Sequence, residues 1–109
     1  MAQKSILSDT PKNLIHKYKI TLANEGIPVQ KIILFGSYAK GTPKPWSDVD
    51  VCVVSKIFGK DYHVEMVHLM QLASEVDDMI EPHPYSPQDL NDPFDPLAYE
   101  IRTTGKVIL

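Results

Sequence analysis

The spacing of hydrophobic residues along the chain alternates between the period of a helix and that of an extended strand. Residues 11–25 place Leu14, Ile15, Tyr18 and Leu22 on one face of a helix that begins at Pro11 and ends before Gly26. Residues 29–35 form a β-branched apolar run typical of a strand, and residues 48–55 form a second one. The pattern therefore predicts helices alternating with strands.

The second half of the chain continues this alternation. A second amphipathic helix is predicted over residues 61–76, with Val64, Val67, Leu69, Met70 and either Leu72 or Ala73 facing inward. Residues 79–85 are predicted to form a short strand, and its prolines indicate the edge of a sheet. A loop is predicted for residues 86–96 and a last helix for residues 97–104. The expected fold class is α/β or α+β, a small mixed sheet with flanking helices.

Composition narrows the class of protein. With 109 residues, 43% of them hydrophobic and 23% charged, residues 1–109 are expected to form a single globular domain. The lone cysteine, Cys52, excludes an internal disulfide and fits a reducing cytoplasm. No apolar run is long enough to span a bilayer, and no dense basic stripe favours direct nucleic-acid binding.

Two aspartates at the head of an apolar strand are the most informative feature of the sequence. Side chains alternate in a strand, so Asp48, Asp50 and Cys52 share one face. Like charges within about 7 Å of each other repel. The arrangement makes sense if a divalent cation such as Mg²⁺ binds between them, because this ion takes carboxylate and phosphate oxygens as ligands.

The dipeptide Gly36-Ser37 lies ten residues before this pair. It ends one predicted strand and begins a single helical turn at residues 37–40. Such a turn exposes backbone N–H groups that bind phosphate oxygens, and the Ser37 hydroxyl can add a hydrogen bond. A phosphate-binding turn beside paired carboxylates predicts metal-assisted phosphoryl or nucleotidyl transfer.

The spacing of these residues resembles a family signature. Gly36-Ser37, ten residues, and then Asp48-Val49-Asp50 is similar to the pattern of the DNA polymerase β-like nucleotidyltransferase superfamily. The short chain resembles its minimal nucleotidyltransferase (MNT) domains, of the MntA type found as antitoxins in HEPN–MNT pairs. The resemblance implies a polymerase β palm-like nucleotidyltransferase fold.

The resemblance also implies roles for individual residues. Asp48 and Asp50 would bind two Mg²⁺ ions that hold ATP as the nucleotide donor, and Gly36 and Ser37 would hold its phosphates. A third carboxylate from a neighbouring strand completes the site in this family. Asp77, Asp78 and Glu81 are candidates, and Glu81 is favoured because it lies within the apolar strand, with His83 on the same face.

The activity implied by the resemblance is transfer of a nucleoside monophosphate, AMP from ATP, to a hydroxyl. The acceptor would be a tyrosine of a partner HEPN toxin, in a homo- or hetero-oligomeric assembly, so that the chain acts as an antitoxin. Two alternatives stay open. One is a non-catalytic antitoxin that neutralises its partner by complex formation, and the other is a transferase that acts on a small molecule.

Overall fold

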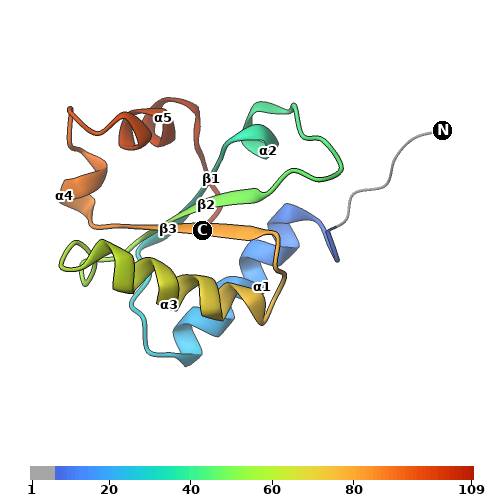
Figure 1. Cartoon of the computed structure of the whole chain (residues 1–109), viewed down its shortest axis with the longest axis horizontal. Helices are drawn as coiled ribbons and strands as arrows, with labels where there is room; N and C mark the ends of the chain where they lie inside the picture. The colour runs from blue at the N-terminus through green and yellow to red at the C-terminus, as the bar shows by residue number, and fades with distance from the viewer. Residues whose placement is uncertain (1–6) are drawn as a thin grey trace.

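A four-stranded mixed sheet forms the centre of the structure, a computed structural model that describes residues 7–109 (Figure 1). In chain order, the elements are α1 (Pro11–Asn24), β1 (Lys31–Phe35), α2 (Ser37–Lys40), β2 (Val49–Val54), α3 (Tyr62–Ser74), β3 (Ile80–Tyr85), α4 (Pro87–Leu90), α5 (Pro96–Thr104) and β4 (Lys106–Val107). The mixed sheet with flanking helices confirms the predicted fold class. Within the described residues, no helix has the length and apolar character needed to cross a membrane.

The strand order is β3-β2-β1-β4, which places β2, the strand that contains Asp50, inside the sheet. β1 runs antiparallel to β2 and β4, whereas β3 runs parallel to β2. The register sets Asp50 between Phe35 of β1 and Glu81 of β3. The three positions therefore form one row across the sheet.

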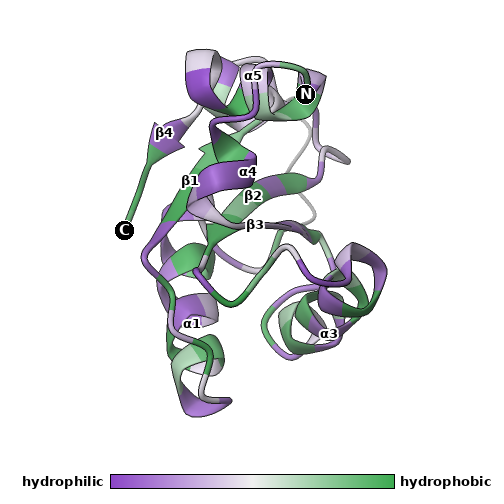
Figure 2. Cartoon of the chain, turned by 90° about the vertical axis from the view of Figure 1, so that its left-hand side faces the viewer, coloured by the Kyte–Doolittle hydropathy of each residue, from purple (hydrophilic) through white to green (hydrophobic). Residues whose placement is uncertain are grey.

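The sheet separates two apolar layers. Val49, Val51 and Val53 pack in the layer that contains α1 and α3, while Cys52 and Val54 pack in the layer of α4 and α5. Figure 2 shows the largely hydrophobic strands β1 and β2 between these layers. The predicted alternation of faces is confirmed, so Asp50 shares the α5 side of the sheet with Cys52.

The prediction that residues 79–85 form an edge strand is confirmed, with the strand beginning at Ile80. The backbone N–H groups of Val49 and Ser55 donate to the carbonyls of Met79 and Tyr85, at 2.8 and 3.0 Å. The alternate positions, Pro82 and Pro84, therefore direct their nitrogens away from β2. Proline has no N–H to leave unpaired there, and it discourages a further strand from joining this edge.

The helices begin where capping side chains accept hydrogen bonds from the first turn. Thr10 accepts from the Asn13 N–H, Asp61 from Val64, and Asp95 from Leu97 and Ala98. The predicted first helix is confirmed: its four apolar residues are buried, and Gly26 follows it with φ of +83°. A residue with positive φ at a helix C-terminus is most often glycine.

The predicted inward face of α3 is largely wrong. Val64, Val67 and Met70 are between 40% and 60% exposed. The side of α3 that is buried carries Leu69, Leu72 and Ala73. This helix has apolar residues on more than one side, so periodicity alone did not select the buried one. Packing against β3 and α1 selects it, and the buried Tyr18 hydroxyl of α1 donates to the Leu69 carbonyl at 2.8 Å.

The structure adds two short elements to those predicted. Residues 86–96 were expected to be irregular, yet α4 forms there because Ser86 caps it and Pro87 occupies its first position. β4 follows α5 and pairs with Ile33 and Leu34 of β1. A strand of only two residues forms because a neighbouring strand lies beside it. No local sequence pattern indicates that position.

Candidate functional site

The turn after β1 brings the backbone against a carboxylate. Gly36 has φ of +74°, which favours glycine, and a Cβ atom added there would overlap Oδ2 of Asp50. The N–H groups of Ala39 and Lys40 both bond to the Gly36 carbonyl at 3.1 Å, which closes the single turn of α2. The glycine is therefore required by the close approach of β1 to the aspartate of β2, and Ser37 begins α2 at the same point.

Asp48, Asp50 and Glu81 form an acidic cluster at one end of the β2–β3 pair, called the acidic cluster below. Asp48 precedes β2 and is exposed, whereas Asp50 and Glu81 are partly buried neighbours in register. The Glu81 carboxyl lies close enough to both aspartates to raise their pKa values.

The proximity of these acids changes their protonation. Burial, followed by the Glu81 carboxylate and then Asp48 and Glu100, raises the pKa of Asp50 to about 7. Partial loss of water contact and the Glu81 carboxylate also raise the pKa of Asp48. Such shifts arise when carboxylates are partly buried and lie close to one another. A bound divalent cation would neutralise them, so the donor set fits a hard metal ion with oxygen ligands.

His83 extends the acidic cluster along β3. One ligand atom from each of Asp50, Glu81 and His83 lies within 4.8 Å of the other two. The His83 Nε2 atom is 3.9 Å from Oε1 of Glu81, and its Nδ1 atom is 3.3 Å from the Tyr62 hydroxyl of α3. Burial lowers the pKa of His83 more than the Glu81 carboxylate raises it, so this imidazole favours the neutral form.

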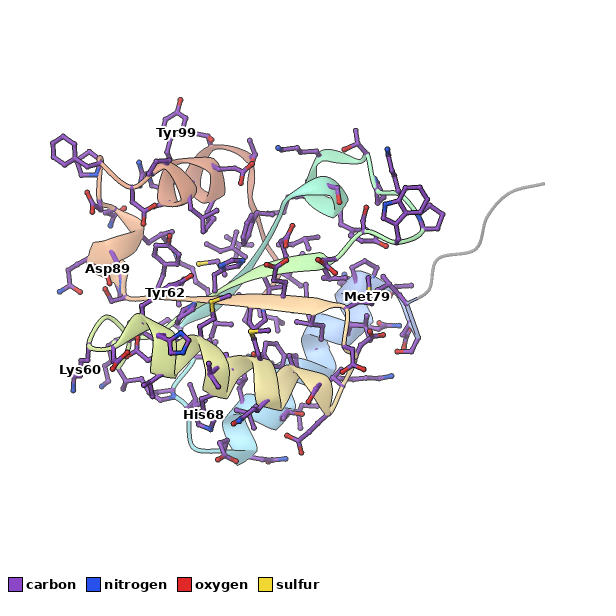
Figure 3. All side chains as sticks on the ribbon, viewed as in Figure 1. Lys60, Tyr62, His68, Met79, Asp89 and Tyr99 are labelled. Carbon is purple, nitrogen blue, oxygen red and sulfur yellow. The ribbon has the colours of Figure 1, made fainter. Side chains whose placement is uncertain are left out.

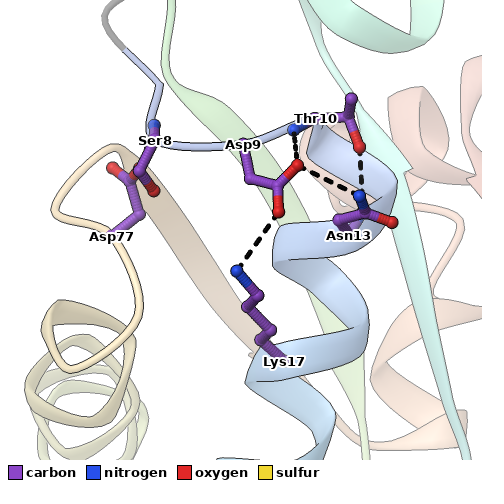
Figure 4. Close-up of polar contacts among 6 residues, drawn as sticks. All are labelled: Ser8, Asp9, Thr10, Asn13, Lys17 and Asp77. Atoms are coloured by element: carbon purple, nitrogen blue, oxygen red, sulfur yellow. Dashed lines mark hydrogen bonds and ion pairs between the residues drawn. The ribbon is translucent and has the colours of Figure 1, made fainter.

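The third-carboxylate candidates have different surroundings. Asp77 accepts hydrogen bonds from the backbone N–H and hydroxyl of Ser8, which lies beside it in Figure 4, and from the Met79 N–H. It therefore anchors the start of the described chain. Asp78 is exposed at the turn into β3. Of the three candidates, the structure brings Glu81 into the cluster with Asp50. The catalytic role of Glu81 stays a prediction.

A pair of opposite charges lies beside the acidic cluster. Lys40 of α2 forms an ion pair with Glu100 of α5 at 3.1 Å, and Glu100 is close enough to raise the pKa of Asp50. In the loop before Asp48, Trp46 is 61% exposed, and the Lys44 ammonium lies 5.5 Å from its ring centroid.

Sequence reasoning missed Tyr62 and Glu100 as neighbours of the site. Tyr62 reaches it from the first turn of α3, as Figure 3 shows, and Glu100 reaches it from α5. Neither residue belongs to a motif near the aspartates. The only signal in the sequence was that each residue carries a polar group and lies on a predicted helix. Many surface residues share this feature.

Comparisons with known proteins identify the family to which the chain is similar. The sequence profile of the nucleotidyltransferase domain family matches residues 17–95. A crystal structure of a toxin–antitoxin with AMP-PNP is similar at 30% identity, with a TM-score of 0.58, over 90% of this chain and 72% of that one. A tri-AMPylated Shewanella oneidensis HEPN toxin in complex with an MNT antitoxin matches at 25% identity, with a TM-score of 0.52, over 90% and 71%.

A more distant structure shares the fold. A nucleotidyltransferase structure from Sulfolobus solfataricus, itself assigned only provisionally, matches at 15% identity with a TM-score of 0.61, over 88% of this chain and 77% of that one. At this identity the likeness concerns the fold alone. A search of curated protein sequences found no match.

Proposed function

Because the chain belongs to the nucleotidyltransferase domain family, we propose that it transfers AMP from ATP to a hydroxyl of a partner protein. The observation that carries the proposal is the acidic cluster beside the Gly36 turn, with Asp50 and Glu81 in register. Asp48 and Asp50 would hold one Mg²⁺ ion, and Asp50 and Glu81 a second. When bound, these ions neutralise the triphosphate and lower the pKa of the attacking hydroxyl.

We propose that the two substrates bind on opposite sides of Asp50, which lies on a strand between β1 and β3. Gly36 and Ser37 lie toward β1, where backbone N–H groups and the Ser37 hydroxyl can donate to phosphate oxygens. Glu81 lies toward β3, where its carboxylate can accept the proton of the acceptor hydroxyl. The acceptor oxygen bonds to the α-phosphorus, the bond from that phosphorus to pyrophosphate breaks, and pyrophosphate leaves.

We propose a HEPN-type toxin as the partner and one of its tyrosines as the acceptor. The support is similarity: at 25–30% identity, the matching structures include a toxin–antitoxin with AMP-PNP and an AMPylated HEPN toxin bound to an MNT antitoxin. The chain would then act as the antitoxin of a pair. Modification by AMP would neutralise the toxin.

The test is transfer of label from α-³²P-ATP. The purified full chain is incubated with Mg²⁺ and the protein encoded beside it, and the products are examined by intact mass and peptide mapping. We expect one or more AMP groups on tyrosine of the neighbour, and none with Asp48→Asn or Asp50→Asn. Asp78→Asn, an exposed acid outside the cluster, is the matched control. Transfer that persists in the double Asp48/Asp50 variant would refute the assigned site.

One observation favours neutralisation by contact as a second candidate. Val64, Val67 and Met70 form an exposed apolar stripe at successive turns of α3, and an apolar stripe on a helix is typical of a protein interface. If the Asp48/Asp50 double variant still neutralises the partner, while Val64→Ser with Met70→Ser does not, binding rather than transfer would be the mechanism.

A further inference from the structure

The cation position beside Glu81 differs from an all-oxygen site because an imidazole faces it. We propose that His83 supplies a nitrogen ligand to the cation held by Asp50 and Glu81, and that this position consequently prefers Mn²⁺ to Mg²⁺. The inference rests on the proposed function only in taking the acidic cluster to bind divalent cations. Among the described residues, these three side chains are the group whose ligand atoms converge within 4.8 Å.

The distances fit two ligands of one ion better than a direct contact between them. His83 Nε2 and Glu81 Oε1 are 3.9 Å apart, too far for a hydrogen bond. Two ligands bound to one cation at about 2.1 Å each lie roughly 3 to 4.2 Å apart, depending on their angle. The pair is therefore separated as two donors to a shared cation would be.

The surroundings of the ring hold it in this orientation. The His83 side chain is 13% exposed, and its ring packs against Phe35 with centroids 5.4 Å apart. Its Nδ1 atom faces the Tyr62 hydroxyl at 3.3 Å. When the Nδ1 proton is donated to that hydroxyl oxygen, Nε2 keeps its lone pair toward Glu81. Metal-binding histidines typically have their second ring nitrogen hydrogen-bonded in this way.

The mixed donor set determines the preference among metals. Mg²⁺ takes oxygen ligands almost exclusively, whereas imidazole nitrogen suits transition metals. Asp48 and Asp50 offer oxygen alone, so the other cation position keeps its preference for Mg²⁺. The two positions of one site would thus differ in the metal that each binds more tightly.

The direct test is pulsed electron paramagnetic resonance of Mn²⁺ bound to the metal-free full chain. We expect modulation from one directly coordinated ¹⁴N nucleus in the wild type. His83→Phe should abolish it while retaining the ring packing against Phe35. His68→Phe is the matched control, because His68 lies on α3, pairs with Glu25 at 3.4 Å, and points away from the sheet (Figure 3).

Titration calorimetry provides a second readout that is independent of catalysis. His83→Phe should weaken Mn²⁺ binding at least about tenfold, and Tyr62→Phe about tenfold, with Mg²⁺ binding changed much less. Tyr99→Phe, an exposed tyrosine of α5, is the control for Tyr62 (Figure 3).

The outcomes separate this inference from the proposed function. Mn²⁺ binding without ¹⁴N coupling in the wild type would overturn the nitrogen ligand and leave AMP transfer standing. Equal Mn²⁺ affinity in wild type and in a folded His83→Phe variant would do the same. Failure of Mn²⁺ and Mg²⁺ to bind at all, with or without a non-hydrolysable ATP analogue, would overturn both.

Discussion

The acidic cluster makes a quantitative prediction about stability in the absence of metal. The pKa of Asp50 rises from 3.8 to about 7 in the folded state, so the folded chain holds a proton that the unfolded chain has lost. Between these two pH values the folded state binds more protons, and the free energy of unfolding must fall as pH rises. The stabilisation is complete below about pH 4 and lost above about pH 7.

The size of the effect follows from the shift and the exposure of the group. About three pKa units correspond to about 4 kcal/mol at 1.36 kcal/mol per unit. Asp50 is only half-buried, and water screens its interactions, so about 1–2 kcal/mol is a realistic loss between pH 4 and pH 8. For a domain of this size, the melting temperature would fall by roughly 4–12 °C.

The assay is urea or thermal unfolding of the metal-free chain in chelator at several pH values between 4 and 8. Asp50→Asn removes the titration and the repulsion, so it should match the wild type near pH 4 and exceed its stability at pH 8. Added Mg²⁺ at pH 8 should restore the wild type and leave Asp50→Asn nearly unchanged. Asp78→Asn, exposed and outside the cluster, should follow the wild-type profile. Parallel profiles for wild type and Asp50→Asn would refute the reasoning.

Three further predictions concern the turn and the core. Gly36→Ala combines a positive φ with an overlap between the new Cβ atom and the Asp50 carboxylate, so it should lower the free energy of unfolding by about 1–3 kcal/mol and abolish transfer. Gly41→Ala has nearly the same φ but open space around the new Cβ atom, so it should keep transfer. Denaturant unfolding and the labelling assay compare them. Tyr18→Phe removes the buried hydroxyl that donates to the Leu69 carbonyl, so it should lower the free energy of unfolding measured by urea denaturation by about 1–2 kcal/mol. An unchanged urea midpoint would argue against that hydrogen bond. Leu69→Ala should lower the free energy of unfolding by about 2–5 kcal/mol, because Leu69 is buried, whereas Val64→Ala at an exposed position should lower it by less than about 0.5 kcal/mol. Equal shifts of the melting temperature in the two variants would contradict this difference.

Local physical chemistry decided much of the fold before any packing was known. The first helix, its buried face and its terminating glycine follow from a period of 3.6, a proline at the first position and the freedom of Gly26. The shared face of Asp50 and Cys52 follows from strand alternation alone. These features depend on residues within a few positions of one another, which is why the sequence was sufficient.

The tertiary structure decided what depends on neighbours distant in the chain. The parallel register of β2 and β3 set Glu81, rather than Asp77 or Asp78, beside Asp50, because strand pairing is a non-local choice among alternatives. The contact of α3 with β3 and α1 chose which of its apolar sides to bury.

The composition of the candidate site shows the same division. The sequence by itself determined the pair of aspartates and the glycine turn ten residues before them, since each is a local pattern with a chemical meaning. The approach of Tyr62 to His83, and of Glu100 to Asp50, arose only when α3 and α5 packed on the sheet. Side chains that meet across elements are selected by the geometry of packing, and that geometry is a property of the whole chain.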